Sequence, residues 1–402
     1  MLQKGVSVFN QGKKLLSALE QLQKGALTVL LPDGSRATYE GREPGHSAEM
    51  QVSRWDVFDR FISKGDVALG EDYIEHFWDT PDLPGFMHFA VENITLFENI
   101  IRPGPFLNFI LMFKHRLLSN TLTRSRRNVH KHYDLGNDFY RLWLDESMTY
   151  SCALFNGDAN LDLKQAQKAK YGRILQRLAP KPGDKILDIG CGWGGFMEET
   201  ATRNHYITGV TISAEQAEYA RLRLLSAGLA DLTDVRLQDY RELTGPFDHI
   251  ASIGMFEHVG EAYWPRFMGD IHQYLKPGGR AMIQTIIVPE YRFDSYRNGN
   301  DFLREYIFPG GMLPTRKRFE RAASNSGLRV KDVFHFGQDY AITLQKWLEN
   351  FDNRLREVKG LGYDEPFIRK WRFYLAGCMA MFRAGLMDVI QVELTRPSAK
   401  QS

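Results

Sequence analysis

Three closely spaced glycines in the segment LDIGCGWGG are the first residues of this sequence that point to a chemical role. Gly190, Gly192 and Gly194 follow an apolar, strand-like run and precede a helix-like one. Glycine lets the backbone approach a ligand closely, and the start of a helix offers free N–H groups. The pattern indicates a nucleotide-containing cofactor, and by itself it fits nicotinamide and flavin cofactors too.

Polar residues near this loop favour S-adenosylmethionine over a dinucleotide. Asp188 lies inside the glycine loop, whereas dinucleotide-binding folds carry their acidic residue about 20 positions further along. Gln238 and Asp239 follow the third strand-like segment and suit the edge of an adenine ring. The turn LKPGGR before the fifth strand-like segment is common in Rossmann-like methyltransferases.

Strand-like and helix-like segments alternate from residue 184 onward. The strand-like segments are 184–190, 206–210, 234–240, 247–259 and 280–288. This alternation predicts an α/β class fold, with the doubly wound parallel sheet of a Rossmann-like methyltransferase domain. Ligands of such sheets bind at the carboxyl ends of the strands, where the glycine loop and Asp239 stand.

Two further segments are expected before the methyltransferase domain, which is predicted at residues 129–402. Residues 1–102 read as a small α+β domain without a catalytic constellation, which favours a helper or lipid-handling role. Residues 103–128 combine an amphipathic helical pattern with a basic cluster. That combination suits an anionic membrane surface, and the alternative is an interdomain helix with a solvated basic tail.

Composition excludes several classes of partner. The 51 Lys and Arg residues nearly balance the 49 Asp and Glu residues, which argues against nucleic acid. The three cysteines are far apart, so neither a metal site nor a disulfide framework is predicted, and a cytoplasmic location fits. No apolar run reaches the ~20 residues that span a bilayer, so the expected attachment at the inner membrane face is peripheral. A homodimer is compatible with the sequence.

The region from residue 128 to about residue 393 resembles the cyclopropane fatty acid synthase family. The resemblance rests on the segment 128–155 and on the motifs SIGMFEHVG and FPGGMLP. Members of this family methylate double bonds in the acyl chains of phospholipids, and they include the mycolic acid relatives. The resemblance implies further cofactor contacts, namely Tyr150, Ser151, Thr211, Gln216 and Tyr240.

The resemblance also implies a bicarbonate ion beside the transferred methyl group. Its ligands match Cys152, Glu257 and Tyr340, whereas the family's histidine is replaced by Gln284. Structural roles for Cys152 and Tyr340 stay open. Cys378 matches a cysteine once proposed as a nucleophile, and packing is favoured there because covalent catalysis serves no step of the expected reaction.

The expected reaction is attack of an alkene on the sulfonium methyl group, followed by loss of a proton to a nearby base. A dry, aromatic cavity would tolerate the intermediate carbocation. Gln284 leaves the product open: direct loss of a methyl proton closes a cyclopropane, and another fate of the same carbocation gives a methylene-branched chain. A methyl-branched product, methylation of a soluble small molecule and a lipid-binding protein without activity also stay open.

Overall fold

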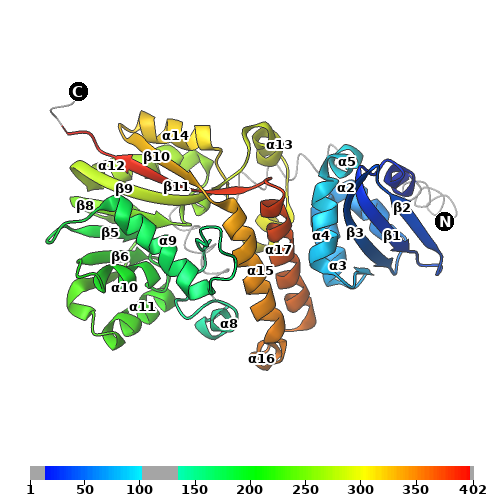
Figure 1. The fold of residues 1–402 in the computed structure, drawn as a ribbon, viewed down its shortest axis with the longest axis horizontal. Coiled ribbons are helices and arrows are strands. Elements are labelled where there is room, and N and C mark those ends of the chain that lie inside the picture. The colour runs from blue at the N-terminus through cyan, green and yellow to red at the C-terminus, as the bar shows by residue number, and fades with distance from the viewer. Residues whose placement is uncertain (1–13, 102–134, 399–402) are drawn as a thin grey trace. The chain divides into compact units, whose positions relative to one another are not determined.

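The computed structural model describes residues 14–101 and 135–398 of the 402-residue chain (Figure 1). The predicted amphipathic linker at 103–128 lies outside the described residues. The chain divides into two compact units. The first combines Met1–Leu117 with Asn298–Pro309 and Phe351–Gly385, and the second holds Leu118–Arg297, Gly310–Asn350 and Leu386–Ser402.

A seven-stranded sheet of order β10-β11-β9-β8-β5-β6-β7 forms the centre of the second unit. Its strands are β5 (Ile186–Ile189), β6 (Ile207–Thr211), β7 (Thr233–Leu237), β8 (Phe247–Ile253), β9 (Leu275–Ile287), β10 (Arg329–His335) and β11 (Asp388–Thr395). Strands β9, β8, β5, β6 and β7 pair in parallel, whereas β11 runs antiparallel to β9 and β10. The predicted α/β, Rossmann-like class is confirmed, although β10 and β11 were not predicted.

Helices of the second unit cover both faces of this sheet (Figure 1). The α-helices described for this unit are α8 (Asn137–Arg141), α9 (Leu163–Leu178), α10 (Gly195–Ala201), α11 (Ala214–Ser226), α12 (Trp264–Tyr274), α13 (Phe293–Asn298), α14 (Arg316–Asn325) and α15 (Gly337–Asn353), and the last residues of α15 are assigned to the first unit. Helix α9 shows why the sequence folds this way, because Tyr171, Ile174, Leu175 and Leu178 recur at helical spacing and pack into one buried cluster with Met282 of β9.

The glycine loop lies directly between β5 and α10. Gly190 and Gly194 have φ angles of +82° and +83°, in the left-handed region that favours glycine. A Cβ atom at position 194 would lie 3.1 Å from Cβ of Ala220 in α11. The absence of a side chain at Gly194 therefore lets α10 start in close contact with α11.

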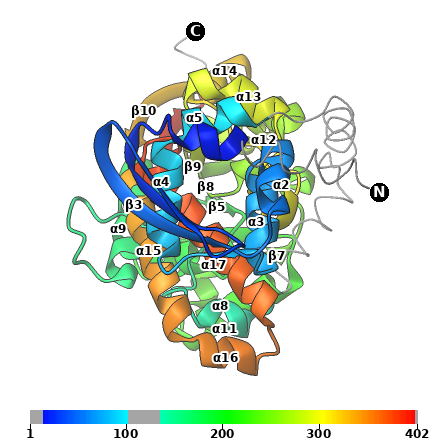
Figure 2. The same cartoon turned by 90° about the vertical axis from the view of Figure 1, so that its right-hand side faces the viewer.

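A four-stranded sheet of order β2-β1-β3-β4 belongs to the first unit. Its strand β3 is labelled in Figure 2. The elements of this unit are β1 (Lys24–Leu30), β2 (Arg36–Glu40), β3 (Glu43–Val52), α2 (Asp56–Lys64), α3 (Asp66–Ile74), β4 (Trp78–Asp79), α4 (Leu83–Glu92), α5 (Ile94–Ile100), α16 (Leu355–Gly360) and α17 (Glu365–Arg383). Strands β1 and β2 form an antiparallel pair, as expected of the predicted small α+β domain, and β3 lies parallel to β1.

Residues far along the chain complete the first unit. Helix α17 packs against α3 and α4. Its Arg369 is buried and donates hydrogen bonds to the carbonyl oxygens of Tyr73 (2.6 Å) and Trp78 (3.3 Å). The predicted domain boundary at residue 102 stays a prediction, and the first unit contains more than the residues before it. No helix among the described residues has the length and apolar character that a bilayer span requires.

The contact between Gly194 and Ala220 predicts a position-specific cost of an added methyl group. Gly194→Ala should lower the free energy of unfolding more than Gly183→Ala, measured by urea denaturation. Gly183 has a φ angle of +87° and open space around its Cβ position, so it carries only the left-handed cost of ~1–2 kcal/mol. Equal losses in the two variants would show that the α10–α11 contact is not tight.

Candidate active site

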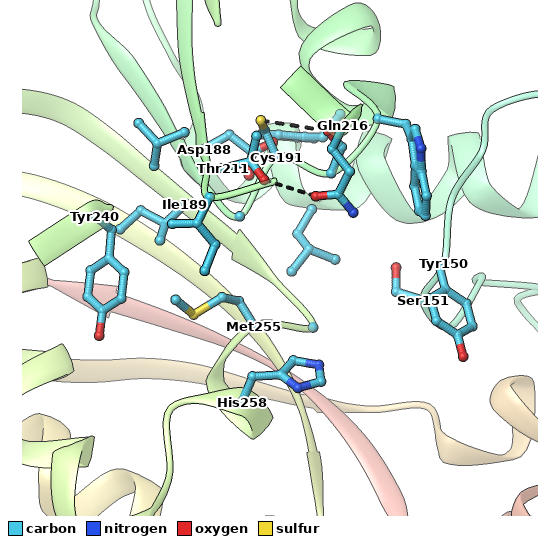
Figure 3. A pocket seen from close by; sticks show the side chains of 18 of the residues that line it. Tyr150, Ser151, Asp188, Ile189, Cys191, Thr211, Gln216, Tyr240, Met255 and His258 are labelled. Atoms are coloured by element: carbon cyan, nitrogen blue, oxygen red, sulfur yellow. Dashed lines mark hydrogen bonds between the residues drawn. The ribbon is translucent and has the colours of Figure 1, made fainter. Parts of the chain in front are cut away.

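A pocket lies at the carboxyl ends of β5, β6 and β8 (Figure 3). All predicted cofactor contacts except one line it, namely Tyr150, Ser151, Asp188, Gly190, Gly192, Thr211, Gln216, Asp239 and Tyr240. Tyr150 and Tyr240 lie at opposite sides of the pocket in this view. The exception is Gly194, whose contact with Ala220 gives it a role in helix packing.

Thr211 and Gln216 form a neutral pair where β6 meets α11. The hydroxyl of Thr211 donates to Oε1 of Gln216 over 2.9 Å. Ser213 caps α11 by accepting a hydrogen bond from the Gln216 backbone N–H at 3.3 Å. This pairing leaves the Nε2 group of Gln216 as a donor, which suits ribose hydroxyls or a carboxylate.

Asp239 is held in place by its neighbour Arg241. The Nε and Nη2 atoms of Arg241 donate to the two carboxylate oxygens of Asp239 over 2.9 and 2.6 Å. Both side chains are buried, so this bidentate pair fixes the orientation of the carboxylate at the pocket wall.

Lys170 is a candidate functional residue that the sequence patterns did not single out. It lies on α9, its side chain is 0% exposed, and its Nζ donates to Oγ of the pocket-lining Ser151 over 2.8 Å. A buried lysine whose hydrogen bond goes to a neutral hydroxyl is unusual, because burial penalises the charged form. Lys170 could have been noticed in the sequence because it lies on the buried face of α9, where Gln167 and Tyr171 are also buried.

Burial brings the ionisation of two groups at this pocket close to neutral pH. It lowers the pKa of Lys170 to about 7, against the opposing effect of Cys152 and of the acidic side chains nearby. It raises the pKa of Asp188 to about 7, against the opposing charge of Lys170. A ligand that brings its own ammonium and carboxylate groups would therefore shift both equilibria.

Glu257 follows β8 and is buried beside the pocket. Its Oε1 accepts a hydrogen bond of 2.7 Å from the backbone N–H of Ile286, and its Oε2 accepts none from the described residues. Burial raises the pKa of Glu257 to about 7. The adjacent His258 lines the pocket, and burial lowers its pKa to about 4, so it is neutral at physiological pH.

Gln284 belongs to a chain of hydrogen-bonded side chains across β9, β11 and α9. Its Oε1 accepts from Nε2 of Gln391 over 3.1 Å, and Oε1 of Gln391 accepts from Nη1 of Arg173 over 2.8 Å. This chain occupies the acceptor atom of Gln284. Its Nε2 makes no hydrogen bond to a described residue, and Gln284 itself is buried and does not line the pocket.

An aromatic cluster connects Tyr340 with the pocket wall. The ring centroids of Tyr340 and Trp347 are 5.8 Å apart, and those of Trp347 and Tyr150 are 5.3 Å apart. Tyr150 also contacts Tyr140 at 5.6 Å and Trp143 at 5.3 Å. These rings form a buried aromatic cluster beside the cofactor contacts, and Tyr150 is the member of the cluster that lines the pocket.

The two remaining predicted cysteines are buried thiols. Cys152 follows the pocket-lining Ser151, and its Sγ donates to the carbonyl of Ala153 over 3.2 Å. Cys378 lies in α17 of the first unit and does not line the pocket. Burial raises the pKa of both thiols, which disfavours the thiolate that a nucleophile needs.

The contact between Lys170 and Ser151 predicts a pH-dependent role in cofactor binding. Lys170→Met should weaken binding of S-adenosylhomocysteine about tenfold and change its dependence on pH between about 6 and 8, because the titrating amine is removed and Asp188 is left as the titrating group. Calorimetric titration at several pH values measures both effects. The matched control is Lys168→Met, at an exposed position of the same helix. Unchanged affinity and pH dependence in Lys170→Met would contradict the assignment.

Known proteins resemble this chain over most of the predicted methyltransferase region. The family model described as mycolic acid cyclopropane synthetase matches residues 120–392. Tuberculostearic acid methyltransferase UfaA1 of Mycobacterium tuberculosis is 34% identical over 379 residues, covering 92% of this chain and 88% of the relative. Cyclopropane-fatty-acyl-phospholipid synthase of Escherichia coli is 36% identical over 358 residues, covering 87% and 88%.

A solved structure supports the same relationship. The mycolic acid cyclopropane synthase CmaA1, in complex with SAH and CTAB, superposes with a TM-score of 0.63 at 32% identity, covering 67% of this chain and 98% of that one. SAH is the demethylated form of S-adenosylmethionine, so that structure supports the cofactor predicted from the glycine loop. The chain belongs to the mycolic acid cyclopropane synthetase family and is an S-adenosylmethionine-dependent methyltransferase.

Proposed function

We propose that this methyltransferase acts on a double bond in an acyl chain of an unsaturated phospholipid and forms a cyclopropane. The observation that carries the proposal is the aromatic wall of Tyr140, Trp143, Tyr150 and Trp347, which continues directly from the cofactor contacts. The name of the Escherichia coli relative supports the same substrate and product.

The pocket residues fit S-adenosylmethionine from one end to the other. Asp188 would hold the methionine ammonium, Thr211 and Gln216 the ribose, and Asp239 the adenine edge, while the glycine loop gives the backbone close access. When bound, the cofactor supplies an electrophilic methyl group. The protein's own contribution is to hold the acceptor carbon in line with that group and to exclude water.

The aromatic wall would stabilise positive charge on the acyl chain. Faces of tyrosine and tryptophan rings attract a cation by ~0.5–2 kcal/mol each, more so where water is absent. Water would also quench a carbocation, so a desolvated wall serves the reaction twice. Tyr150 contributes to both sites, since it lines the cofactor pocket and contacts Trp347 over 5.3 Å.

Removal of the surplus proton requires a base. We propose that Glu257 binds this base and does not itself take the proton. A bicarbonate ion, when bound, would supply that base. A glutamic acid whose pKa is about 7 can donate a hydrogen bond to an oxyanion when protonated, and Nε2 of Gln284 offers two more donors. The roles of Cys152 and Tyr340 as further ligands stay predictions.

A branched acyl product is the second candidate. Gln284 favours it, because a neutral amide holds an anionic base less tightly than a protonated histidine would. A weakly held base would leave time for a hydride to shift from the methyl-bearing carbon to the cationic carbon, and loss of a methyl proton from the shifted cation then leaves a methylene branch. One relative is named as a methyltransferase of tuberculostearic acid, so the names within this family are not confined to cyclopropanes. Peripheral attachment to a membrane and a homodimeric state stay predictions.

Incubation with vesicles of a monounsaturated phospholipid and methyl-labelled S-adenosylmethionine tests the substrate. Released fatty acids should gain one CH2 unit, as measured by mass spectrometry. Glu257→Gln should lower the rate by about 10²–10⁴, the usual contribution of general acid–base catalysis. Glu261→Gln, at a partly exposed neighbour paired with Arg297, is the matched control. Turnover on a soluble acceptor but not on vesicles would contradict the proposal.

The hydrogen-bond chain through Gln391 makes the product question testable. Gln284→His should raise the ratio of cyclopropane to branched product and the response of the rate to added bicarbonate. Gln391→Met should lower both, because it releases the acceptor atom of Gln284 and lets the amide turn. Fragmentation of the labelled fatty acids separates ring from branch. An identical product ratio and bicarbonate response in all three proteins would show that Gln284 does not control the product.

A further inference from the structure

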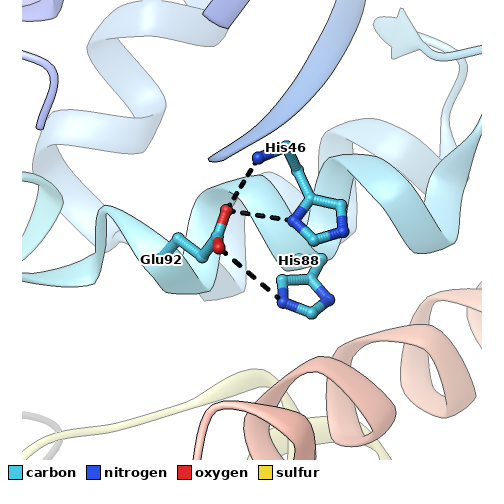
Figure 4. A group of neighbouring side chains, drawn as sticks. All are labelled: His46, His88 and Glu92. Atoms are coloured by element: carbon cyan, nitrogen blue, oxygen red, sulfur yellow. Dashed lines mark hydrogen bonds and ion pairs between the residues drawn. The ribbon is translucent and has the colours of Figure 1, made fainter. Parts of the chain in front are cut away.

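Two histidines and a glutamate lie together in the first unit, and none of them lines the methyltransferase pocket (Figure 4). His46 comes from β3, whereas His88 and Glu92 lie one turn apart on α4. Residues four positions apart on a helix share one face. The fold therefore brings three side chains with metal-binding atoms to one place from two elements.

The three donor groups are close enough to share one cation. Nδ1 of His46 lies 3.1 Å from Oε2 of Glu92, and Nε2 of His88 lies 4.0 Å from Oε1. One ligand atom from each residue lies within 4.8 Å of the others. Bonds of about 2.0–2.2 Å in a tetrahedral zinc site imply ligand atoms roughly 3.3 Å apart, so small side-chain movements would complete the geometry.

The two imidazole rings must separate for both to bind the same ion. They are stacked, with centroids 3.8 Å apart and planes inclined by 20°. The side chain of His46 is 48% exposed and can turn outward, whereas His88 is only 17% exposed and Glu92 19%. Helix α4 thus supplies two mostly buried ligands, His88 and Glu92, and β3 supplies His46, whose exposed side chain can change its rotamer.

We propose that His46, His88 and Glu92 form a binding site for a divalent transition-metal ion such as Zn²⁺. Two imidazoles and one carboxylate are a ligand set that zinc prefers, and a water molecule at the exposed side would complete a tetrahedron. Because the ligands come from β3 and α4, a bound ion would cross-link the sheet of the first unit to its helix.

The surroundings keep the ligands in metal-binding form. Burial, aided by the neighbouring His46 ring, lowers the pKa of His88, so its imidazole stays neutral. Hydrogen bonds from the backbone N–H and ring of His46 lower the pKa of Glu92 despite its partial burial. The carboxylate is therefore in the ionised form that a metal ligand needs.

Titration of the untagged full-length protein with Zn²⁺, in competition with a chromogenic chelator, tests the site. We expect one equivalent of zinc to bind, and we expect His88→Asn and Glu92→Gln each to weaken binding at least tenfold. His76→Asn is the matched control, because His76 is exposed in the same unit and lies 3.8 Å from Asp79 without a third ligand. The cysteines are buried and offer no competing surface site.

A second measurement separates a lost site from a lost fold. Without metal, the His88→Asn variant should unfold at the same temperature as the wild type, and only the wild type should gain stability from Zn²⁺. Bound Co²⁺ should give the visible spectrum of a tetrahedral site in the wild type alone. Equal zinc affinity in wild type and His88→Asn, or no zinc-dependent gain in stability, would overturn the proposal.

Discussion

Exclusion of water from the carboxyl edge of the seven-stranded sheet is the constraint on which the active site depends. Asp188, Lys170 and Glu257 are all buried there, and burial moves the pKa of each to about 7. The same dryness that makes these groups costly to ionise would protect a carbocation from water. Exclusion of water is thus the common cause of the shifted pKa values and of the proposed protection of the carbocation.

The fold creates this dry edge by placing each wall on a different element. The glycine loop between β5 and α10 supplies backbone without side chains, α9 supplies Lys170 behind Ser151, and the turn after β8 supplies Glu257. Trp347 of α15 joins Tyr150 to Tyr340. A substitution in any of these elements would therefore change hydration as well as geometry.

Sequence patterns could predict the parts of the site that are local along the chain. The glycine loop and the polar strand ends follow directly from alternating strands and helices, and their placement in one pocket agrees with that pattern. Lys170 could not be found this way, since its partner Ser151 is 19 positions away and only tertiary packing buries it. The chain from Arg173 through Gln391 to Gln284 depends on the pairing of β11 with β9, two strands separated by about a hundred residues.

The active site depends on the raised pKa of Glu257, because a carboxyl group that titrates near neutrality can hold a basic anion, whereas a permanently ionised one would repel it. Difference infrared spectra of wild type and Glu257→Gln, recorded between about pH 5 and about pH 9, measure it directly. We predict a carboxylic acid carbonyl band that is lost with a midpoint near neutrality in the wild type and is absent from the variant. A Glu257 band that titrates at the ordinary pKa of a glutamate, about 4.3, would contradict a role of Glu257 in holding the base.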